Sequence, residues 1–283
     1  MTRTQVPLAG RTAVITGAGS GIGRALAQRL SAAGCPVAIA DQDAANLADT
    51  EASLPGPALA RPLDVRDRQA LLTFAAQTDE WSAGLGRPIG AVVNNAGVTV
   101  AQTVAEAALE DDEWVMAVNY GGVVNGTRAF LPILLRQDSG TLVNISSVFG
   151  LFGFPNQSAY VASKHAVRGF SESLRQELRG SGVRIAVVHP GGVRTNIVRN
   201  ARWHVDDTGS SDHGLAMERF AAIARTTPER AAKIIQSGIE RGDPRIRIGA
   251  DAVAMDVLVR VAPVRYFSVL DRLEKLTRPK SLR

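Results

Sequence analysis

Short apolar runs alternate with helix-forming segments along most of this chain. Seven runs read as buried strands, and they are Arg11–Thr16, Pro36–Asp41, Ala58–Val65, Ile89–Asn94, Thr141–Ser146, Val183–His189 and Arg245–Gly249. Helices are expected between them, at Gly21–Ala33, after Asp43, after Asp67, at Asp111–Arg136 and at Ser158–Arg179. Strands that alternate with helices form a parallel sheet with right-handed connections and helices on both faces. The pattern therefore predicts an α/β fold with a doubly wound parallel sheet of about seven strands.

The 283 residues fit a single domain of this kind. Residues 8–195 carry the regular alternation and form the expected core. The next stretch, 196–225, lacks a clear helical period and is rich in Gly, Ser, Asp and His, which indicates an excursion that serves as a substrate lid. Residues 251–283 form a basic, amphipathic C-terminal extension.

Cysteine and histidine usage excludes several kinds of site. The chain has one cysteine, Cys35, so it has no internal disulfide and no cysteine-rich zinc site. Its His, Asp and Glu residues show no metal-binding spacing, and we expect no metal. The first ten residues lack an export signal, and no apolar run reaches the roughly 18 uncharged residues of a membrane span. A cytoplasmic location is expected.

A glycine-rich turn joins the first predicted strand to the first helix. It comprises Gly17, Gly19, Ser20, Gly21, Ile22 and Gly23. Glycines let the backbone approach a pyrophosphate, and a helix N-terminus offers free N–H groups and the positive end of its dipole. The spacing G-x-x-x-G-x-G differs from the familiar G-x-G-x-x-G, and a tight strand-to-helix connection alone would also explain it.

An acidic residue at the end of the second strand supports the nucleotide interpretation. Asp41 lies 18 residues after Gly23, where a carboxylate accepts hydrogen bonds from the adenosine ribose and repels a 2′-phosphate. Asp43 is the better candidate for capping the next helix. Neither Ser20 nor Gln42 supplies the cation that a 2′-phosphate would need. The sequence therefore favours NAD over NADP as cofactor.

A tyrosine and a lysine share one face of a predicted helix. Tyr160 and Lys164 are four residues apart, and Ser147 follows a strand whose carboxyl end faces the ligand edge of the sheet. Free tyrosine, with a pKa near ~10, is a poor proton-transfer group at neutral pH. A neighbouring ammonium is expected to lower the pKa of Tyr160, so that the pair moves a proton on or off a substrate oxygen.

These motifs occur in one order and spacing together with Asn94-Asn95-Ala96-Gly97, Asn119 and Pro190-Gly191. The set resembles the short-chain dehydrogenase/reductase family, in its single-domain oxidoreductase branch, over roughly Leu8 to Thr195. The resemblance implies a Rossmann-type fold and hydride transfer between a nicotinamide and an alcohol or ketone. It also implies a homodimer or homotetramer, assembled chiefly through the helices Asp111–Arg136 and Ser158–Arg179.

The resemblance assigns roles position by position. Tyr160 is the general acid/base, Lys164 lowers its pKa and holds the nicotinamide ribose, Ser147 bonds the substrate oxygen, and Asn119 helps to order a water chain that leads to Lys164. Further residues are implied in cofactor binding beyond the glycine turn and Asp41, and these are Asp64, Val65, Asn94, Ala96, Gly97, Tyr160, Lys164, Pro190, Gly191, Val193 and Thr195.

The substrate is less constrained than the reaction. Residues 148–155 are strongly apolar, which indicates either a pocket for a lipophilic alcohol or ketone or packing behind the catalytic loop. Alternatives are an NADP-dependent carbonyl or 3-oxoacyl reductase, and a non-catalytic nucleotide-sensing regulator. Such a regulator usually lacks the tyrosine, lysine or serine that this chain keeps. A sugar-nucleotide epimerase or dehydratase would need a longer substrate region.

Charge is concentrated at the C-terminal end. The whole chain carries +5, and residues 225–283 hold 13 Lys and Arg against 7 Asp and Glu, so the rest is close to neutral. That distribution does not predict a nucleic-acid partner. Between Asp251 and Leu276 an apolar stripe has basic flanks, interrupted by Pro263. Packing on the body or on a neighbouring subunit is favoured over contact with an anionic membrane surface.

Overall fold

The computed structural model describes residues 7–205 and 209–269. One seven-stranded sheet has the order β3-β2-β1-β4-β6-β7-β9, and all its neighbouring strands are parallel. The strands are β1 (Thr12–Thr16), β2 (Val37–Asp41), β3 (Ala58–Pro62), β4 (Ile89–Asn94), β6 (Gly140–Ile145), β7 (Val183–Pro190) and β9 (Arg245–Ile248). The predicted α/β class and the seven-stranded parallel sheet are confirmed.

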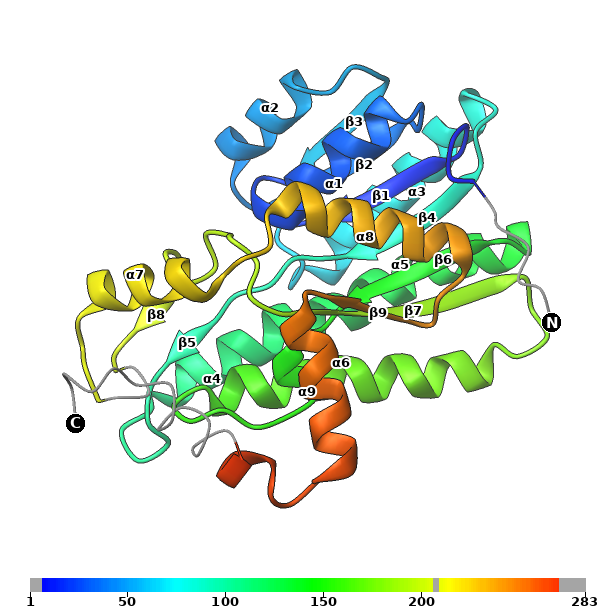
Figure 1. The fold of residues 1–283 in the computed structure, drawn as a ribbon. Coiled ribbons are helices and arrows are strands. Elements are labelled where there is room, and N and C mark those ends of the chain that lie inside the picture. The colour runs from blue at the N-terminus through cyan, green and yellow to red at the C-terminus, as the bar shows by residue number, and fades with distance from the viewer. Residues whose placement is uncertain (1–6, 206–208, 270–283) are drawn as a thin grey trace.

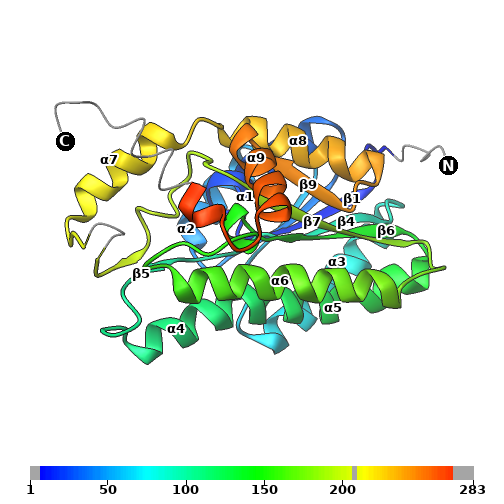
Figure 2. The same cartoon turned by 60° about the horizontal axis from the view of Figure 1, so that its bottom comes forward.

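Helices cover both faces of this sheet, as Figures 1 and 2 show. The helices α1 (Gly21–Ala32) and α8 (Pro228–Arg241) pack together on one face. The other face carries α3 (Arg68–Gly84), α5 (Gly122–Gln137) and α6 (Ser158–Glu177). A shorter helix, α2 (Ala44–Ala52), packs beside β3.

The core consists of two apolar layers because strand side chains alternate between the faces. In β1, Ile15 packs toward α1 and α8, whereas Val14 packs toward α3 and α5. The second layer contains Phe74 and Phe130, whose rings meet edge to face with centroids 5.8 Å apart. Every residue of β1 is buried, which explains its uninterrupted apolar sequence.

Local sequence signals account for the ends of several helices. The α8 helix begins after Thr227, whose hydroxyl accepts the N–H of Arg230, and has Pro228 at its first position. It ends at Gly242 in the left-handed conformation, with φ +71°. Asp43 caps α2 by accepting the Asn46 N–H, as the sequence predicted, and Asp67, after which a helix was expected, caps α3 by accepting the Ala70 N–H.

The predicted helix Asp111–Arg136 is divided into three segments. The α4 helix (Leu109–Met116) continues through a π-helical turn, η1 (Ala117–Gly121), into α5. Single π turns inside α-helices are rare and often lie at functional sites. The sequence analysis predicted one regular helix here and did not predict the π-helical hydrogen bonds of η1.

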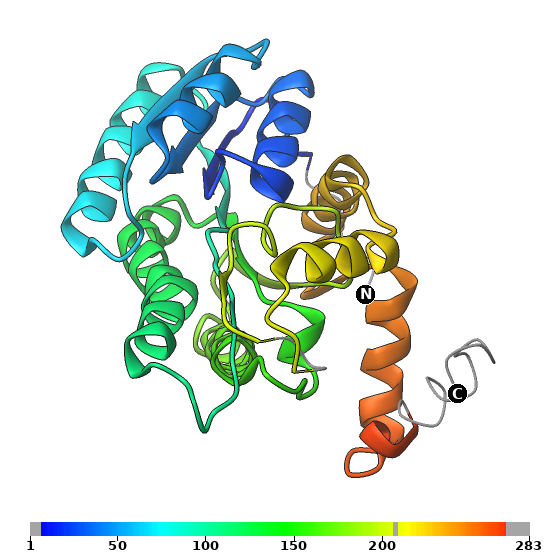
Figure 3. The ribbon, with the colours of Figure 1, turned by 90° about the vertical axis from the view of Figure 1, so that its left-hand side faces the viewer.

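The excursion 196–225 contains regular structure that sequence periodicity did not indicate. It holds α7 (His213–Ile223) and the short strand β8 (Arg202–Trp203), which pairs with β5 (Val100–Ala101). Only Ala216 of α7 is fully buried, so the helix has no wide apolar face for a pattern search to detect. Figure 3 shows α7, in yellow, beside the ends of the strands.

The C-terminal part begins with α9 (Ala250–Val261), after which Pro263 lies in a turn. The sequence predicted that Pro263 interrupts this helix, and the break there is confirmed. The part of the predicted stripe from Leu270 to Leu276 lies outside the described residues. Across residues 7–205 and 209–269, no helix has the length and apolar character to span a bilayer.

Candidate active site

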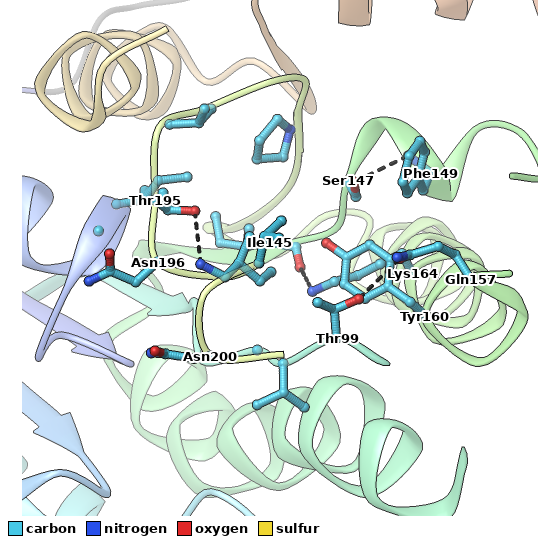
Figure 4. A pocket seen from close by; sticks show the side chains of 18 of the residues that line it. Thr99, Ile145, Ser147, Phe149, Gln157, Tyr160, Lys164, Thr195, Asn196 and Asn200 are labelled. Atoms are coloured by element: carbon cyan, nitrogen blue, oxygen red, sulfur yellow. Dashed lines mark hydrogen bonds between the residues drawn. The ribbon is translucent and has the colours of Figure 1, made fainter. Parts of the chain in front are cut away.

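A large cleft opens at the carboxyl ends of the strands, with a volume of about 1160 Å³. Strand order reverses between β1 and β4, and such a switch point is where open parallel sheets bind ligands. Figure 4 shows Ser147, Tyr160 and Lys164 on one side of the pocket, with Thr195 and Asn196 opposite. Sixteen residues predicted for the site line the cleft, and these are Gly17, Ser20, Gly21, Ile22, Asp41, Asp64, Val65, Ala96, Gly97, Ser147, Tyr160, Lys164, Pro190, Gly191, Val193 and Thr195.

The glycine turn after β1 is tightly packed against its surroundings. Gly17 has φ +65°, and a Cβ atom there would lie 2.7 Å from the Cα atom of Ala96 after β4. A Cβ on Gly23 would collide with the carbonyl oxygen of Gly17. These glycines therefore bring the backbone and the start of α1 to the cleft surface. That is the cradle a dinucleotide pyrophosphate needs, and the residues present fit the group.

Asp41 is fixed at the rim of this cradle. Its Oδ2 atom accepts the Gly19 N–H at 2.8 Å, and its Oδ1 atom accepts the Asp43 N–H at 3.0 Å. A Cβ on Gly19 would come within 2.9 Å of the Asp41 carboxyl carbon, so only glycine permits this approach. Each carboxylate oxygen can accept a second hydrogen bond, which leaves acceptor capacity for ribose hydroxyls.

Asp64 and Val65 line the same half of the cleft after β3. The Asp64 carboxylate is held by Arg66, whose Nε and Nη2 atoms donate at 2.8 and 2.6 Å. The hydrogen bonds from the Arg66 side chain lower the pKa of Asp64 below its usual value. Val65 packs closely on Gly122. A Cβ atom added to Gly122 would lie 2.6 Å from the Cγ2 atom of Val65.

The resemblance implies that Asn94 borders the cofactor and stabilises the sheet, and its side chain is not among those that line the cleft. Its side chain is 3 % exposed and donates to Asn144 Oδ1 at 2.8 Å, which ties β4 to β6 beneath α5. Side chains alternate along a strand, so the next residue, Asn95, reaches the cleft instead. Asn95 Nδ2 donates to the carbonyl oxygens of Thr16 and Gly17, both at 3.0 Å, and holds the glycine turn.

Asn119 lies in the π turn and is completely buried. Its Oδ1 atom accepts the Val98 N–H at 2.8 Å, and its Nδ2 atom donates to Val98 O at 3.0 Å and to Ser163 Oγ at 2.9 Å. It is not among the residues that line the cleft. Asn119 therefore fixes the segment after β4 against α6 and acts on the site through its neighbours.

Ser147 and Tyr160 bring two hydroxyl groups together. Ser147 follows β6 and begins the short 3-10 turn η2 (Val148–Gly150), where its Oγ atom accepts the Phe149 N–H at 3.2 Å. The Ser147 side chain also acts on the Tyr160 hydroxyl and lowers the pKa of the phenol. Both residues are buried, and both line the cleft. A substrate oxygen placed between them would meet two hydrogen-bonding groups at once.

Lys164 lies beneath Tyr160, one turn along α6. Its Nζ atom donates to the carbonyl oxygen of Ile145 at 3.1 Å and lies 5.5 Å from the centroid of the Tyr160 ring. Ser146 Oγ donates to Lys164 O at 2.8 Å and anchors this part of the helix to β6. Tyr160 and Lys164 therefore lie on the same face of α6, as their spacing of four residues predicted.

The expected lowering of the tyrosine pKa is wrong for the protein as described. Burial raises the pKa of Tyr160 to about 12, and the hydrogen bond from Ser147 opposes this only in part. Burial also lowers the pKa of Lys164 to about 8. Removal of both groups from water disfavours their charged forms, and here that effect exceeds the attraction between ammonium and phenolate.

His189, the penultimate residue of β7, supports the serine from behind. Its side chain is fully buried, and Nδ1 lies 3.0 Å from the carbonyl oxygen of Ser147. Since a carbonyl only accepts, Nδ1 carries the proton in this contact. Burial lowers the pKa of His189 to about 4, so the imidazole is neutral at physiological pH. The sequence analysis did not single out His189, because nothing in its local pattern distinguishes it from a core residue.

Another part of the cleft lining is apolar and aromatic. Phe149 stacks on Phe154 with centroids 4.8 Å apart, and both line the cleft. Of the two interpretations of residues 148–155, the pocket lining is therefore supported. The sequence analysis expected a substrate lid at 196–225 but did not single out the residues that line the cleft from α4, the excursion and α9. These are Trp114 of α4, Trp203, Phe220 and Ile223 of the excursion, and Met255 of α9.

Asp111 and Trp114 of α4 attach the excursion to the rest of the molecule, and a ring stack joins two parts of the excursion itself. The Asp111 carboxylate accepts from Arg202 Nη1 at 2.6 Å and contacts His204 Nε2 at 2.8 Å. The Arg202 guanidinium lies over the Trp114 ring, 3.9 Å from its centroid. Trp203 stacks on His213 with centroids 5.0 Å apart. These contacts hold the excursion over the apolar half of the cleft.

Comparison with known proteins agrees with this geometry. Residues 11–206 match the family model described as short chain dehydrogenase. The chain is 43 % identical over 262 residues to "Putative oxidoreductase SadH" of Mycobacterium tuberculosis, covering 91 % of this chain and 92 % of that protein.

Two solved structures show the same fold. A short-chain dehydrogenase/reductase from Burkholderia phymatum in complex with NAD superposes with a TM-score of 0.82 at 28 % identity, over 90 % of this chain and 95 % of the other. The closed form of serine dehydrogenase complexed with NADP+ gives a TM-score of 0.73 at 27 % identity, over 84 % and 94 %. The chain is therefore a member of the short-chain dehydrogenase/reductase family and an NAD(P)-dependent oxidoreductase.

Proposed function

We propose that this protein transfers a hydride between NAD and an apolar secondary alcohol or ketone, with Tyr160 as the general acid/base. The observation that carries the proposal is that Ser147 and Tyr160 line one cleft, with the Lys164 Nζ atom 5.5 Å from the centroid of the Tyr160 ring. Phe149 meets the Tyr160 ring edge to face, with centroids 6.2 Å apart, and residues of the glycine turn line the same cleft. Ser147 and Tyr160 thus lie where a nucleotide site and an apolar site meet.

The protein groups supply the proton and the geometry. When bound, the nicotinamide supplies or accepts the hydride. In ketone reduction Tyr160 donates its proton to the carbonyl oxygen, and in alcohol oxidation it accepts the hydroxyl proton. Ser147 donates a hydrogen bond to the same oxygen as negative charge develops there. The Lys164 Nζ atom lies 5.5 Å from the centroid of the Tyr160 ring, and in its protonated form it places a positive charge there that favours the phenolate.

The lining of the cleft supports an apolar substrate. Aromatic surface in the cleft is offered by Phe149, Phe152, Phe154, Trp114 and Phe220. Aromatic side chains bind apolar ligands through large contact areas, and a small number of polar groups then fixes their orientation. In this site the two hydroxyls orient the reacting oxygen, while the rings hold the rest of the molecule.

Asp41 supports a preference for NAD. Its carboxylate lies beside the glycine turn and can accept hydrogen bonds from ribose hydroxyls, whereas a 2′-phosphate in the same place would face a negative charge. The cofactor proposal rests on this one side chain and is tested separately below.

The decisive experiment compares Tyr160→Phe with the wild-type protein. Reduced nicotinamide absorbance is followed over a series of secondary alcohols and ketones of increasing apolar size, with NAD and with NADP. We expect Tyr160→Phe to fold, to bind NADH as judged by its fluorescence, and to lose turnover by about 10²- to 10⁴-fold. Tyr120→Phe is the matched control, because Tyr120 packs on Phe170 away from the cleft lining. Retention of wild-type turnover by Tyr160→Phe would refute the assignment.

A further inference from the structure

An apolar stripe runs along the outer side of α9 and into the turn after it. Val253, Val257, Val261 and Val264 are 42, 53, 79 and 89 % exposed, and Phe267 beyond them is 52 % exposed. Spacings of four residues place Val253, Val257 and Val261 on one side of α9, and Val264 follows in the turn after the helix. We call these five residues the C-terminal stripe. Figure 3 shows α9, in orange, along the outside of the molecule.

The helix is attached to the body through a different side. Ala252 and Asp256 are buried, Met255 lines the active-site cleft, and Val259 lines a second cavity. The body therefore does not cover the C-terminal stripe within the described residues. Five exposed apolar side chains in one row form a patch of the kind that marks an interaction site.

Four arginines gather around Asp256 of α9 and Glu172 of α6. Arg168 comes from α6, Arg245 and Arg247 from β9, and Arg260 from α9 itself, and we call them the arginine cluster. The carboxylates among them are Asp256, which pairs with Arg245, Arg247 and Arg260, and Glu172, which pairs with Arg168 and Arg245. Four cations against two anions leave a surplus of two positive charges.

The second cavity, of about 500 Å³, opens within this cluster. It is lined by Arg168, Arg245 and Arg260 together with His165 and Asp256. Arg260 is 59 % exposed and lies between Val257 and Val261 of the stripe in the sequence. A phosphate group at the cavity would therefore meet guanidinium groups, including that of Arg260, which precedes Val261 of the stripe in the sequence.

We propose that the C-terminal stripe and the arginine cluster dock this protein on the surface of an anionic phospholipid bilayer. The valines and Phe267 enter the boundary between headgroups and acyl chains, and the arginines meet lipid phosphates. An amphipathic helix with apolar residues on one side and basic residues beside them binds membranes in this way. The surplus of basic residues from Arg225 to the C-terminus adds attraction to the same surface.

Charge argues against a second copy of the chain as the occupant. A twofold axis through the stripe would place the same patch on both subunits and would bring two positively charged clusters together. An anionic surface, in contrast, is complementary to both the stripe and the cluster. Docking there also brings the cleft close to the lipid, because Met255 on the same helix lines the cleft.

Co-sedimentation of the full-length protein with vesicles tests the docking. Vesicles of phosphatidylcholine alone are compared with vesicles containing phosphatidylglycerol, at low and at high salt. We expect binding to the anionic vesicles that weakens as salt rises. The double variant Val257→Glu/Val261→Glu should bind at least tenfold more weakly, while Leu85→Glu, at an exposed site on α3's C-cap, should bind like wild type.

A second pair of substitutions tests the cluster. Arg168→Gln/Arg260→Gln leaves Glu172 paired with Arg245, and Asp256 paired with Arg245 and Arg247, so the fold should be retained. We expect weaker binding with a smaller salt dependence, and unchanged turnover of a water-soluble substrate. Sedimentation is read independently of catalysis, so docking can fail while the proposed function stands.

Two results would overturn the proposal. One is that the protein does not bind anionic vesicles at low salt, or that its binding is unchanged by both pairs of substitutions. The other is a dimer in vesicle-free solution that Val257→Glu/Val261→Glu converts to a monomer, with no vesicle binding, because the stripe would then be a subunit interface.

Discussion

The Lys164 Nζ atom lies 5.5 Å from the centroid of the Tyr160 ring, and both side chains are buried below the cleft surface. Burial raises the pKa of the phenol to about 12 and lowers the pKa of the ammonium to about 8. The protein therefore holds Tyr160 protonated at neutral pH. That state is ready to donate a proton to a carbonyl oxygen.

Alcohol oxidation should consequently accelerate with pH, because it needs the phenolate. In the protein without nucleotide, we expect the ultraviolet phenolate signal of Tyr160, taken as wild type minus Tyr160→Phe, to appear only toward pH 12. Initial rates at constant ionic strength should rise with pH for oxidation and stay level or fall for ketone reduction. A phenolate signal already present at pH 8 would contradict the raised pKa.

Burial of Lys164 should reduce stability at neutral pH. Between pH 8 and 10.5 the folded protein binds fewer protons at this group than the unfolded chain does, so stability rises with pH across that window. The pKa difference corresponds to about 3 kcal/mol at pH 7. Lys164→Met also removes the hydrogen bond to Ile145 O, so a net gain of about 1–2 kcal/mol is expected at pH 7.

Denaturant unfolding at pH 7 and near pH 10 measures this effect. The gain from Lys164→Met should shrink at the higher pH, while turnover is lost at both. Lys233→Met on the exposed side of α8 is the control and should change stability little. Equal destabilisation by Lys164→Met at both pH values would mean that packing, not charge, dominates at this position.

His189 should make the protein sensitive to acid. Its folded pKa of about 4 lies below the ordinary 6.5, so its stabilising contribution is complete above pH 6.5 and is lost as pH falls through 4. The expected loss reaches about 3 kcal/mol. His189→Gln keeps a donor for Ser147 O and should flatten the acid limb of stability against pH, whereas exposed His165→Gln should not. Superimposable acid limbs for His189→Gln and wild type would rule out this role.

Asp41 should determine the choice of cofactor. Asp41→Asn keeps an acceptor oxygen for the Gly19 N–H but removes the negative charge. We expect the ratio of kcat/KM for NADP to that for NAD to rise about 10- to 100-fold, since hydrogen bonds to charged groups contribute about 1.5–3 kcal/mol. Asp43→Asn serves as the control, because Asp43 caps α2 beside the same site. A wild-type preference for NADP would end the interpretation of Asp41.

Most of the sheet follows from the sequence because buried parallel strands leave continuous apolar runs. The runs at Arg11–Thr16 and Ile89–Asn94 match β1 and β4 to within a residue. The strand expected at Ala58–Val65 ends at Pro62, since the chain then turns to place Asp64 and Val65 at the cleft. Helix α7 was missed because it lies over the cleft with little buried surface of its own.

The active site, like the fold, has a part that the sequence predicts and a part that it does not. Residues that follow strands, such as Ser147 and Asp41, could be placed because parallel strands bring their carboxyl ends to one edge. The aromatic half could not, because Trp114, Phe220 and Met255 come from three helices whose relative positions depend on long-range packing. The effect of burial on the Tyr160 pKa likewise depends on the whole fold, and the i, i+4 spacing alone gives the opposite sign.

The π turn at Ala117–Gly121 sets the rotational phase between two halves of one long helix. Each residue in a helix turns the chain by about 100°, so deleting a single residue from this turn would twist α4 against α5 by that angle. Asn119 would then leave Val98 and Ser163, and Trp114 would swing out of the cleft. The irregular turn therefore acts as a spacer that keeps the substrate side of the enzyme in alignment with its cofactor side.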